Sequence, residues 1–144
     1  MANYYIQLSE SILNKEKLGE NTWSLRRELN NVSFGIFQSK INTDELKNIF
    51  WSNIYNEFFL RVEGRKQVET ATIFKVKMVK FSGYVLSLND IEFGILGTKK
   101  INLGFYELSN PFYPSYIRKL AVEKFDKNKV NHLIKSTLNT ICEV

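Results

Sequence analysis

Few residues of this chain have the side-chain types of common catalytic centres. His132 is its single histidine and Cys142 its single cysteine. They fall on one predicted helix, where their separation is about 15 Å at about 1.5 Å per residue. Because a thiolate–imidazolium pair needs direct contact, we predict no nucleophilic centre here. The scarcity of histidine and cysteine also argues against a classical zinc site.

Carboxylates offer a second route to chemistry, through metal-assisted hydrolysis. Asp90 and Glu92 are separated by one residue, and Glu69 and Lys75 fall on a neighbouring predicted strand. A nuclease site of this kind needs Glu-x-Lys near a second acid, whereas residues 63–66 read EGRK. The stretch GILGTKK, residues 94–100, lacks the spacing of a phosphate-binding loop and indicates a hairpin turn. We therefore expect a non-enzymatic protein that binds no metal or cofactor.

Composition places the chain among ordinary globular proteins. Its 144 residues are 44% hydrophobic and 24% charged, so we expect a single domain over residues 1–144. No signal peptide or transmembrane run is evident, and one cysteine allows no internal disulfide, which favours the cytoplasm; secretion without disulfides is the alternative. Frequent asparagine, lysine and isoleucine indicate an AT-rich genome, such as that of a low-GC bacterium or its phage. If a phage encodes the protein, the expected compartment is the cytoplasm of the host cell.

The hydrophobic pattern predicts an α+β fold. Four alternating apolar runs lie within residues 67–107, the third of them over residues 91–95, separated by short turns that include Ser82-Gly83 and Asn89-Asp90. Short links between alternating runs are typical of antiparallel neighbours, so we predict a four-stranded antiparallel meander. Amphipathic helices, expected over 43–62, 115–125 and 127–142, would cover it. In the first of these helices Thr43 is the expected N-cap.

The N-terminal region is predicted to mix strands and helices. The apolar run NYYIQL, residues 3–8, indicates a strand, and residues 9–19 a short helix that Ser9 caps and Gly19 ends. Residues 21–31 fit either a helix or a strand, because their apolar side chains satisfy both periods. The alternation in VSFGIF, residues 32–37, indicates another strand.

We expect the protein to act by contact with another protein, for instance as an accessory or inhibitor protein of a phage, mobile element or AT-rich bacterium. Trp, Tyr and Arg commonly anchor protein interfaces. Three groups of these residues are candidate contact sites: Trp23 with Arg26 and Arg27, Trp51 with Tyr55, and Tyr113 with Tyr116 and Arg118.

Two other binding functions remain open. The net charge of +5 and one basic cluster fit nucleic-acid binding, although lysines guarding a sheet edge explain them as well. That cluster comprises Arg61, Arg65, Lys66, Lys75, Lys77 and Lys80. An aromatic-lined cavity between sheet and helices would instead bind an apolar, lipid-like ligand. Trp51 and Tyr55 would then line a cavity, whereas a solvent-facing patch or, as the favoured interpretation, plain core are the alternatives.

The segment NPFYPSYIRKL, residues 110–120, contains both prolines of the chain. Pro111 should end the last strand, and Pro114 suits the start of the next helix, where a missing N–H costs nothing. A stiff connector that presents Tyr113 and Tyr116 beside Arg118 would make a contact surface. We therefore interpret the segment as a connector first and as a binding patch second.

Overall fold

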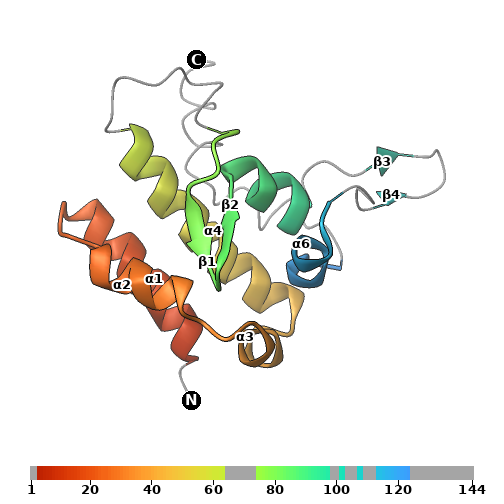
Figure 1. Ribbon diagram of the computed structural model, residues 1–144, viewed down its shortest axis with the longest axis horizontal. Helices are drawn as coiled ribbons and strands as arrows, with labels where there is room; N and C mark the ends of the chain where they lie inside the picture. The colour runs from red at the N-terminus through yellow and green to blue at the C-terminus, as the bar shows by residue number, and fades with distance from the viewer. Residues whose placement is uncertain (1–2, 64–73, 98–100, 103–106, 109–112, 124–144) are drawn as a thin grey trace.

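The computed structural model describes residues 3–63, 74–97, 101–102, 107–108 and 113–123, in which helices predominate (Figure 1). The elements follow in the order α1 (Tyr4–Lys17), α2 (Trp23–Asn30), α3 (Phe34–Lys40), α4 (Asp44–Glu63), β1 (Val79–Phe81), β2 (Tyr84–Leu86), η1 (Asp90–Ile95), β3 (Ile101–Asn102), β4 (Glu107–Leu108) and α6 (Ser115–Leu120). The expected combination of helices with antiparallel strands is confirmed, but the four-stranded meander is wrong.

Helix α1 replaces the strand that was predicted at residues 3–8. Asn3 is its N-cap, and the Asn3 side chain accepts a hydrogen bond from the Tyr5 amide at 3.0 Å. Tyr5, Leu8 and Ile12 then form a helical stripe that is buried against α4. This stripe outweighs the β-propensity of the first residues, so the helix starts before Ser9. Gly19, at φ +72°, follows the end of the helix as expected.

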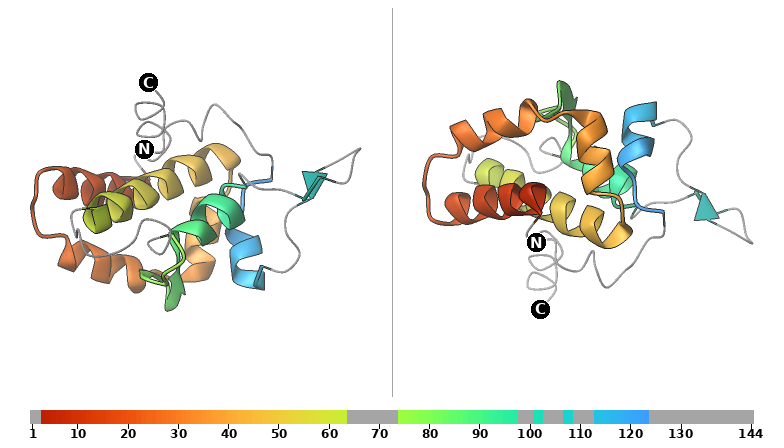
Figure 2. Two further views of the ribbon diagram at one scale, coloured as in Figure 1. Left: turned by 90° about the horizontal axis from the view of Figure 1, so that it is seen from above. Right: turned by 90° about the horizontal axis from the view of Figure 1, so that it is seen from below.

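Helices α2 and α3 follow, and residues 3–63, as described, contain no strand. Residues 21–31 were ambiguous and form α2, whereas the strand expected at residues 32–37 is wrong. There α3 begins at Phe34, and Phe37 and Ile41 lie on its buried side. The spacing of three and four residues that joins these side chains is the helical period. Figure 2 shows α1 and α2 lying side by side, linked by a short turn.

Helix α4 is the centre of the molecule and matches the helix expected over residues 43–62. The Thr43 hydroxyl caps it, accepting a hydrogen bond from the Leu46 amide at 3.2 Å. Further along, apolar side chains are buried on more than one side of the helix: Phe50, Trp51, Ile54, Tyr55, Phe58, Phe59 and Val62. A helix that is apolar around most of its circumference belongs inside a protein, where neighbours cover it.

Of the expected meander, the described residues retain the hairpin β1–β2 and the two-residue strand β3. Val79 pairs with Leu86 and Phe81 with Tyr84, in antiparallel register. The turn was predicted correctly at Ser82 and Gly83, whose φ values of +49° and +83° fit the primed turn that matches strand twist. Strands β3 and β4 form a second, separate two-stranded pair. Residues 67–73 of the predicted first strand lie outside the described residues.

The strand expected at residues 91–95 is wrong, because the π-helix η1 occupies this position. A reciprocal pair of hydrogen bonds starts it: Asp90 N–H donates to Ser87 Oγ at 3.0 Å, and Ser87 N–H to Asp90 Oδ2 at 2.9 Å. This is the capping-box arrangement, which converts an apparent turn into the beginning of a helix. The Leu96 amide then donates to the Ile91 carbonyl at 2.8 Å, the long spacing of a π-helix.

Helix α6 packs against η1 and ends earlier than expected, at Leu120 rather than at residue 125. The helix expected over 127–142, with His132 and Cys142, lies outside the described residues. None of the helices in the described ranges combines the length and apolar composition needed to cross a membrane.

Gly94 provides a test of the packing between η1 and α6. A Cβ atom at this position would lie 2.8 Å from Ile117 Cγ2 and 3.2 Å from Tyr113 Cε1. Because Ile117 is fully buried, Gly94→Ala should lower the free energy of unfolding by about 1–3 kcal/mol, as overpacking does. Urea denaturation monitored by circular dichroism measures this change.

Gly35→Ala is the matched control. A Cβ atom there would meet nothing within 4 Å, and Gly35 lies inside α3, so this change should stabilise the protein by about 0.5–1 kcal/mol. A Gly94→Ala protein as stable as the parent would show that η1 and α6 do not pack as described.

Candidate functional site: a basic pocket beside α2

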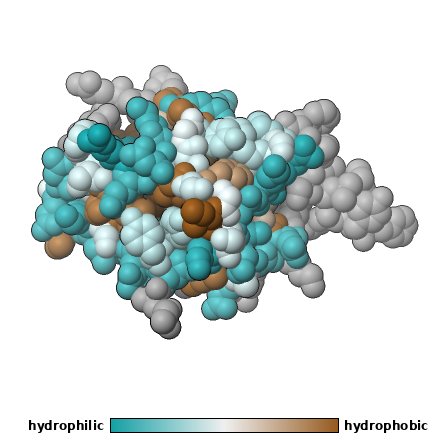
Figure 3. Space-filling model, turned by 60° about the horizontal axis from the view of Figure 1, so that its bottom comes forward, coloured by the Kyte–Doolittle hydropathy of each residue, from teal (hydrophilic) through white to brown (hydrophobic). Residues whose placement is uncertain are grey.

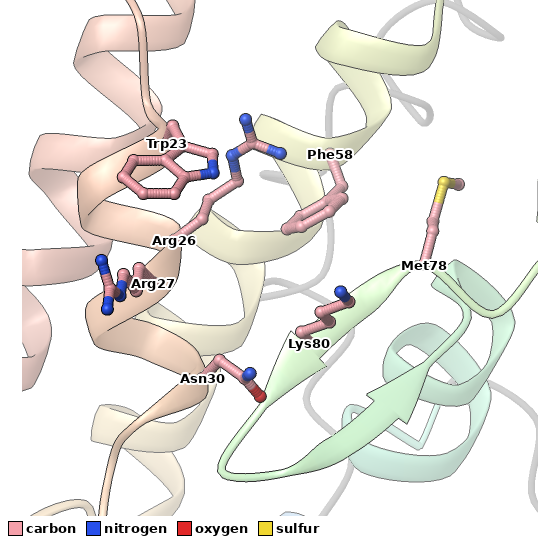
Figure 4. Close-up of a pocket in the computed structure, with 7 residues that line it drawn as sticks. All are labelled: Trp23, Arg26, Arg27, Asn30, Phe58, Met78 and Lys80. Atoms are coloured by element: carbon pink, nitrogen blue, oxygen red, sulfur yellow. The ribbon is translucent and has the colours of Figure 1, made fainter.

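A pocket of about 330 Å³ lies between α2, α4 and β1, and we call it the α2 pocket (Figure 4). It is lined by Trp23, Arg26, Arg27, Asn30, Phe58, Met78 and Lys80. Three of these side chains are cationic, and none of the described residues that line the pocket is acidic. The first group of predicted contact residues, Trp23 with Arg26 and Arg27, therefore lines a single pocket.

The α2 wall follows directly from helical spacing. Trp23, Arg26, Arg27 and Asn30 repeat at intervals of three and four residues, so they share one face of α2. Arg26 Nε donates to Thr22 Oγ1 at 3.0 Å, which fixes the base of this guanidinium group. The Arg27 guanidinium carbon lies 5.5 Å from the centroid of the Trp23 ring, within the range of a cation–π contact.

The opposite wall comes from the hairpin and from α4. Val79 and Phe81 are buried, whereas Lys80 between them is exposed, as the alternation of a strand requires. In Figure 4 the Lys80 side chain extends from β1 toward the Phe58 ring, which comes from α4. Met78, the residue immediately before β1, also lines the pocket.

Two hydrogen bonds hold the hairpin against α2. The Gly83 amide donates to Asn30 Oδ1 at 3.1 Å, and the Ser82 amide donates to the Leu29 carbonyl at 3.2 Å. Both partners lie at the end of α2, so the turn of the hairpin is fixed to the helix that forms the first wall. The strand that carries Lys80 is thus held beside the helix that carries Arg26 and Arg27.

Glu57 is a buried carboxyl group on α4, in the residue before Phe58. Glu57 is 0% exposed, and neither carboxyl oxygen has a hydrogen-bond partner within the described part of the chain. Burial, reinforced by the charge of Glu16, raises the pKa of Glu57 to about 8, although the charge of Arg26 opposes this shift. A protonated Glu57 does not neutralise Arg26, whose positive charge remains available to the pocket.

The second group of predicted contact residues lies in the core. Trp51 and Tyr55 are both 0% exposed. Burial and then the Glu92 carboxylate raise the pKa of Tyr55, whose hydroxyl donates to Glu92 Oε2 at 3.4 Å. Neither ring presents a surface to a partner in this structure.

The third group forms a surface of its own, away from the α2 pocket. The half-buried Tyr116 stacks on Tyr84 of the hairpin with ring centroids 4.0 Å apart, and Arg118 is exposed. Tyr113 is half-buried, and burial followed by the charge of Asp90 raises its pKa. Pro114 precedes α6 as its N-cap, so the interpretation of the segment as a connector agrees with its structure from Tyr113 onward.

The predicted basic cluster is divided among different environments. The Arg61 guanidinium carbon lies 4.1 Å from the centroid of the Phe58 ring. Lys77 forms an ion pair with Asp90, and Lys80 lines the α2 pocket. Lys75 is exposed in the loop before β1. The other two members of the cluster, Arg65 and Lys66, lie outside the described residues.

Asp90 and Glu92, two of the carboxylates that suggested metal chemistry, are buried and engaged, whereas Glu69 lies outside the described residues. Asp90 accepts hydrogen bonds from Lys77 Nζ and from the Ser87 amide, and Glu92 accepts one from Tyr55. Across the described ranges, no three histidine, cysteine, aspartate or glutamate side chains gather in a way that would hold a metal ion.

Comparison with known proteins identifies the family. Residues 38–140, more than half of the chain, match the model of a family described as "Protein of unknown function, DUF547". The chain belongs to the DUF547 family. No curated protein and no solved structure matches it.

The match to DUF547 divides the α2 pocket. Phe58, Met78 and Lys80 belong to the matched region, whereas α1 and α2 precede it. The wall that carries Trp23 and Arg26 is therefore contributed by a part of the chain that the DUF547 model does not cover. The basic pocket arises where this N-terminal helical segment packs on the DUF547 region.

Three pocket residues and the buried acid were not singled out from the sequence. Asn30 continues the spacing of Trp23, Arg26 and Arg27, so choosing a helix for residues 21–31 would have revealed it. Glu57 interrupts the apolar positions of α4, which was a visible signal of a buried acid. Phe58 and Met78 carried no such signal, because their position beside α2 depends on the tertiary contacts.

Proposed function

We propose that this DUF547 protein acts by binding another protein, through the face of α2 that presents Trp23, Arg26 and Arg27. The observation that carries the proposal is the exposure of Trp23, which is 60% accessible beside a ready-made pocket. Tryptophan and arginine are the residues that most often dominate binding energy at interfaces. Contact between an exposed tryptophan ring and water is unfavourable. A partner that covers the ring removes this contact and gains the hydrophobic free energy of burial.

The proposed role is non-catalytic, that of an accessory or inhibitor protein in the cytoplasm. The engaged state of Asp90 and Glu92 supports binding rather than hydrolysis, and the single cysteine supports a reducing compartment. Other exposed apolar side chains are scattered over several elements: Tyr4, Leu18, Ile36, Ile49, Val76, Tyr84 and Val85. Figure 3 shows apolar patches separated by hydrophilic residues on one face, a pattern that favours amphipathic anchors over a broad apolar surface.

Trp23→Ala tests this proposal. The tagged full-length protein and the variant are used for capture from native lysate of the source cells, with quantitative identification of protein and nucleic acid. We expect at least one partner protein that the parent retains and that Trp23→Ala loses by about tenfold or more, since an anchoring tryptophan contributes about 2 kcal/mol or more.

Ile36→Ala is the matched control, because Ile36 is 55% exposed on α3 and does not line the pocket. Its captured proteins should equal those of the parent. A set of partners that both variants retain equally would contradict the proposal, as would the recovery of nucleic acid alone. Circular dichroism of both variants verifies that the fold is intact.

A further inference from the structure

The lining of the α2 pocket combines positive charge with apolar surface. Arg26, Arg27 and Lys80 supply three cations, while Trp23, Phe58 and Met78 supply two rings and a thioether. Like charges that line one pocket repel each other, and an anionic group placed between them relieves this repulsion. The complementary occupant is therefore an anion joined to an apolar group.

The cations reach the pocket from two sides. Arg26 extends from α2 and Lys80 from β1, and in Figure 4 their charged ends lie on two sides of the Phe58 ring. A guanidinium and an ammonium group on opposite walls can donate hydrogen bonds to the two oxygens of one carboxylate.

Much of the site is organised before any ligand arrives. The bond from Arg26 to Thr22 Oγ1 holds Arg26, and Thr22 itself is 3% exposed. Asn30 accepts the Gly83 amide through its oxygen, so its NH₂ group remains a donor on the same face. Groups that are already fixed lose little conformational entropy when a ligand binds, which favours affinity.

The size and the distribution of charge favour a peptide segment over a polyanion. A volume of about 330 Å³ lies at the small end of ligand pockets and suits one or two side chains. A nucleic acid would gain affinity from a track of unpaired cations, but Lys77 is paired with Asp90 and Arg61 stacks on Phe58.

We propose that the α2 pocket binds an acidic segment of the partner protein, with a carboxylate between Arg26 and Lys80 and a neighbouring apolar side chain against Trp23 and Phe58. This inference rests on the proposed function and specifies the chemistry of the partner. The wall that provides Arg26 lies outside the region that the DUF547 model covers, so the specificity belongs to the N-terminal segment of this chain.

A pair of synthetic peptides tests the inference with the full-length protein. One short fluorescent peptide alternates glutamate with phenylalanine and leucine, and its counterpart has glutamine in place of every glutamate. Fluorescence anisotropy should show that the glutamate peptide binds at least about tenfold more tightly than the glutamine peptide, because only the former forms charge-assisted hydrogen bonds.

Two substitutions connect this binding to the pocket. Lys80→Gln and Arg26→Gln should each weaken binding of the glutamate peptide by about tenfold. Lys80 is exposed, so Lys80→Gln keeps the test valid even if Arg26→Gln impairs folding. Lys40→Gln, which changes an exposed lysine on α3 outside the pocket lining, should leave the affinity unchanged.

The outcomes separate this inference from the proposed function. Equal binding of the two peptides, or of neither, would refute an acidic occupant, even where Trp23 still captures a protein. Binding of a short single-stranded DNA that Lys80→Gln weakens, without binding of the glutamate peptide, would assign the pocket to phosphate groups instead. Peptide binding that depends on Lys80, combined with capture that is independent of Trp23, would support the pocket chemistry and contradict the proposed function.

Discussion

Trp51→Ala is expected to lower the free energy of unfolding by about 3–5 kcal/mol, as large-to-small changes in a packed core do. Trp51 is 0% exposed on the central helix α4. Its ring contacts three others edge-on, with centroids 4.9 Å from Phe50, 5.0 Å from Phe81 and 6.1 Å from Phe37. Removing the indole would leave a cavity between α3, α4 and β1 that these rings cannot close without moving.

Urea denaturation followed by circular dichroism measures this loss, and Trp51→Phe is the control. Phenylalanine keeps a ring in the cluster and removes Trp51 Nε1, a buried donor without a hydrogen-bond partner among the described residues. We therefore expect a clearly smaller loss than for alanine. Trp23→Ala, in contrast, should change stability by about 0.5 kcal/mol or less, because its side chain is exposed. Equal stability of Trp51→Ala and the parent would contradict the core position of Trp51.

Glu57→Gln is expected to stabilise the protein, and to do so increasingly as the pH rises. Burial and the charge of Glu16 raise the pKa of Glu57 from 4.5 to about 8. Below about pH 4.5 the carboxyl group is protonated in the folded and unfolded chains alike, so it imposes no cost. Between pH 4.5 and 8 the unfolded chain releases this proton and the folded chain retains it, which favours unfolding. Above pH 8 the loss of stability is complete.

The size of this effect follows from linkage. One pKa unit corresponds to about 1.4 kcal/mol, so the cost at neutral pH is on the order of 3 kcal/mol. Glutamine carries no proton to lose, and the difference in free energy of unfolding between variant and parent should therefore grow between pH 5 and pH 8. Glu10→Gln, which changes an exposed acid on α1, should leave the pH dependence unchanged. A difference between Glu57→Gln and the parent that does not grow across this range would contradict the buried state of Glu57.

Sequence patterns predicted the structure correctly where an apolar pattern sustained over many residues and a local hydrogen bond indicated the same element. Helix α4 carries an apolar period over five turns and a threonine cap, and it was predicted to within one residue at each end. The turn at Ser82-Gly83 was equally clear, because positive φ values restrict the residues that a tight hairpin accepts. In both cases the interactions that select the structure lie within a few residues of each other.

Patterns failed where a short apolar run satisfied two periods. Residues 3–8, 32–37 and 91–95 alternate like strands, but each lies in or overlaps a helix in the structure. At the first and third sites a capping side chain decided the outcome, through Asn3 and through Ser87 with Asp90. At the second site, burial of Phe37 on α3 favoured the helix. Side-chain burial against a distant partner outweighs a β-propensity of at most about 1 kcal/mol.

By itself, the sequence determined the central helix, the tight hairpin turn, and the group of Trp23, Arg26 and Arg27 as a candidate contact site. Only the tertiary structure decided that Trp51 and Tyr55 are core, that Lys77 is paired with Asp90, and that Lys80 and Arg26 line the same pocket. The physical reason is one of range. Caps and turns form between residues that are neighbours in the chain, whereas burial and charge convergence arise when α2, α4 and β1 pack together.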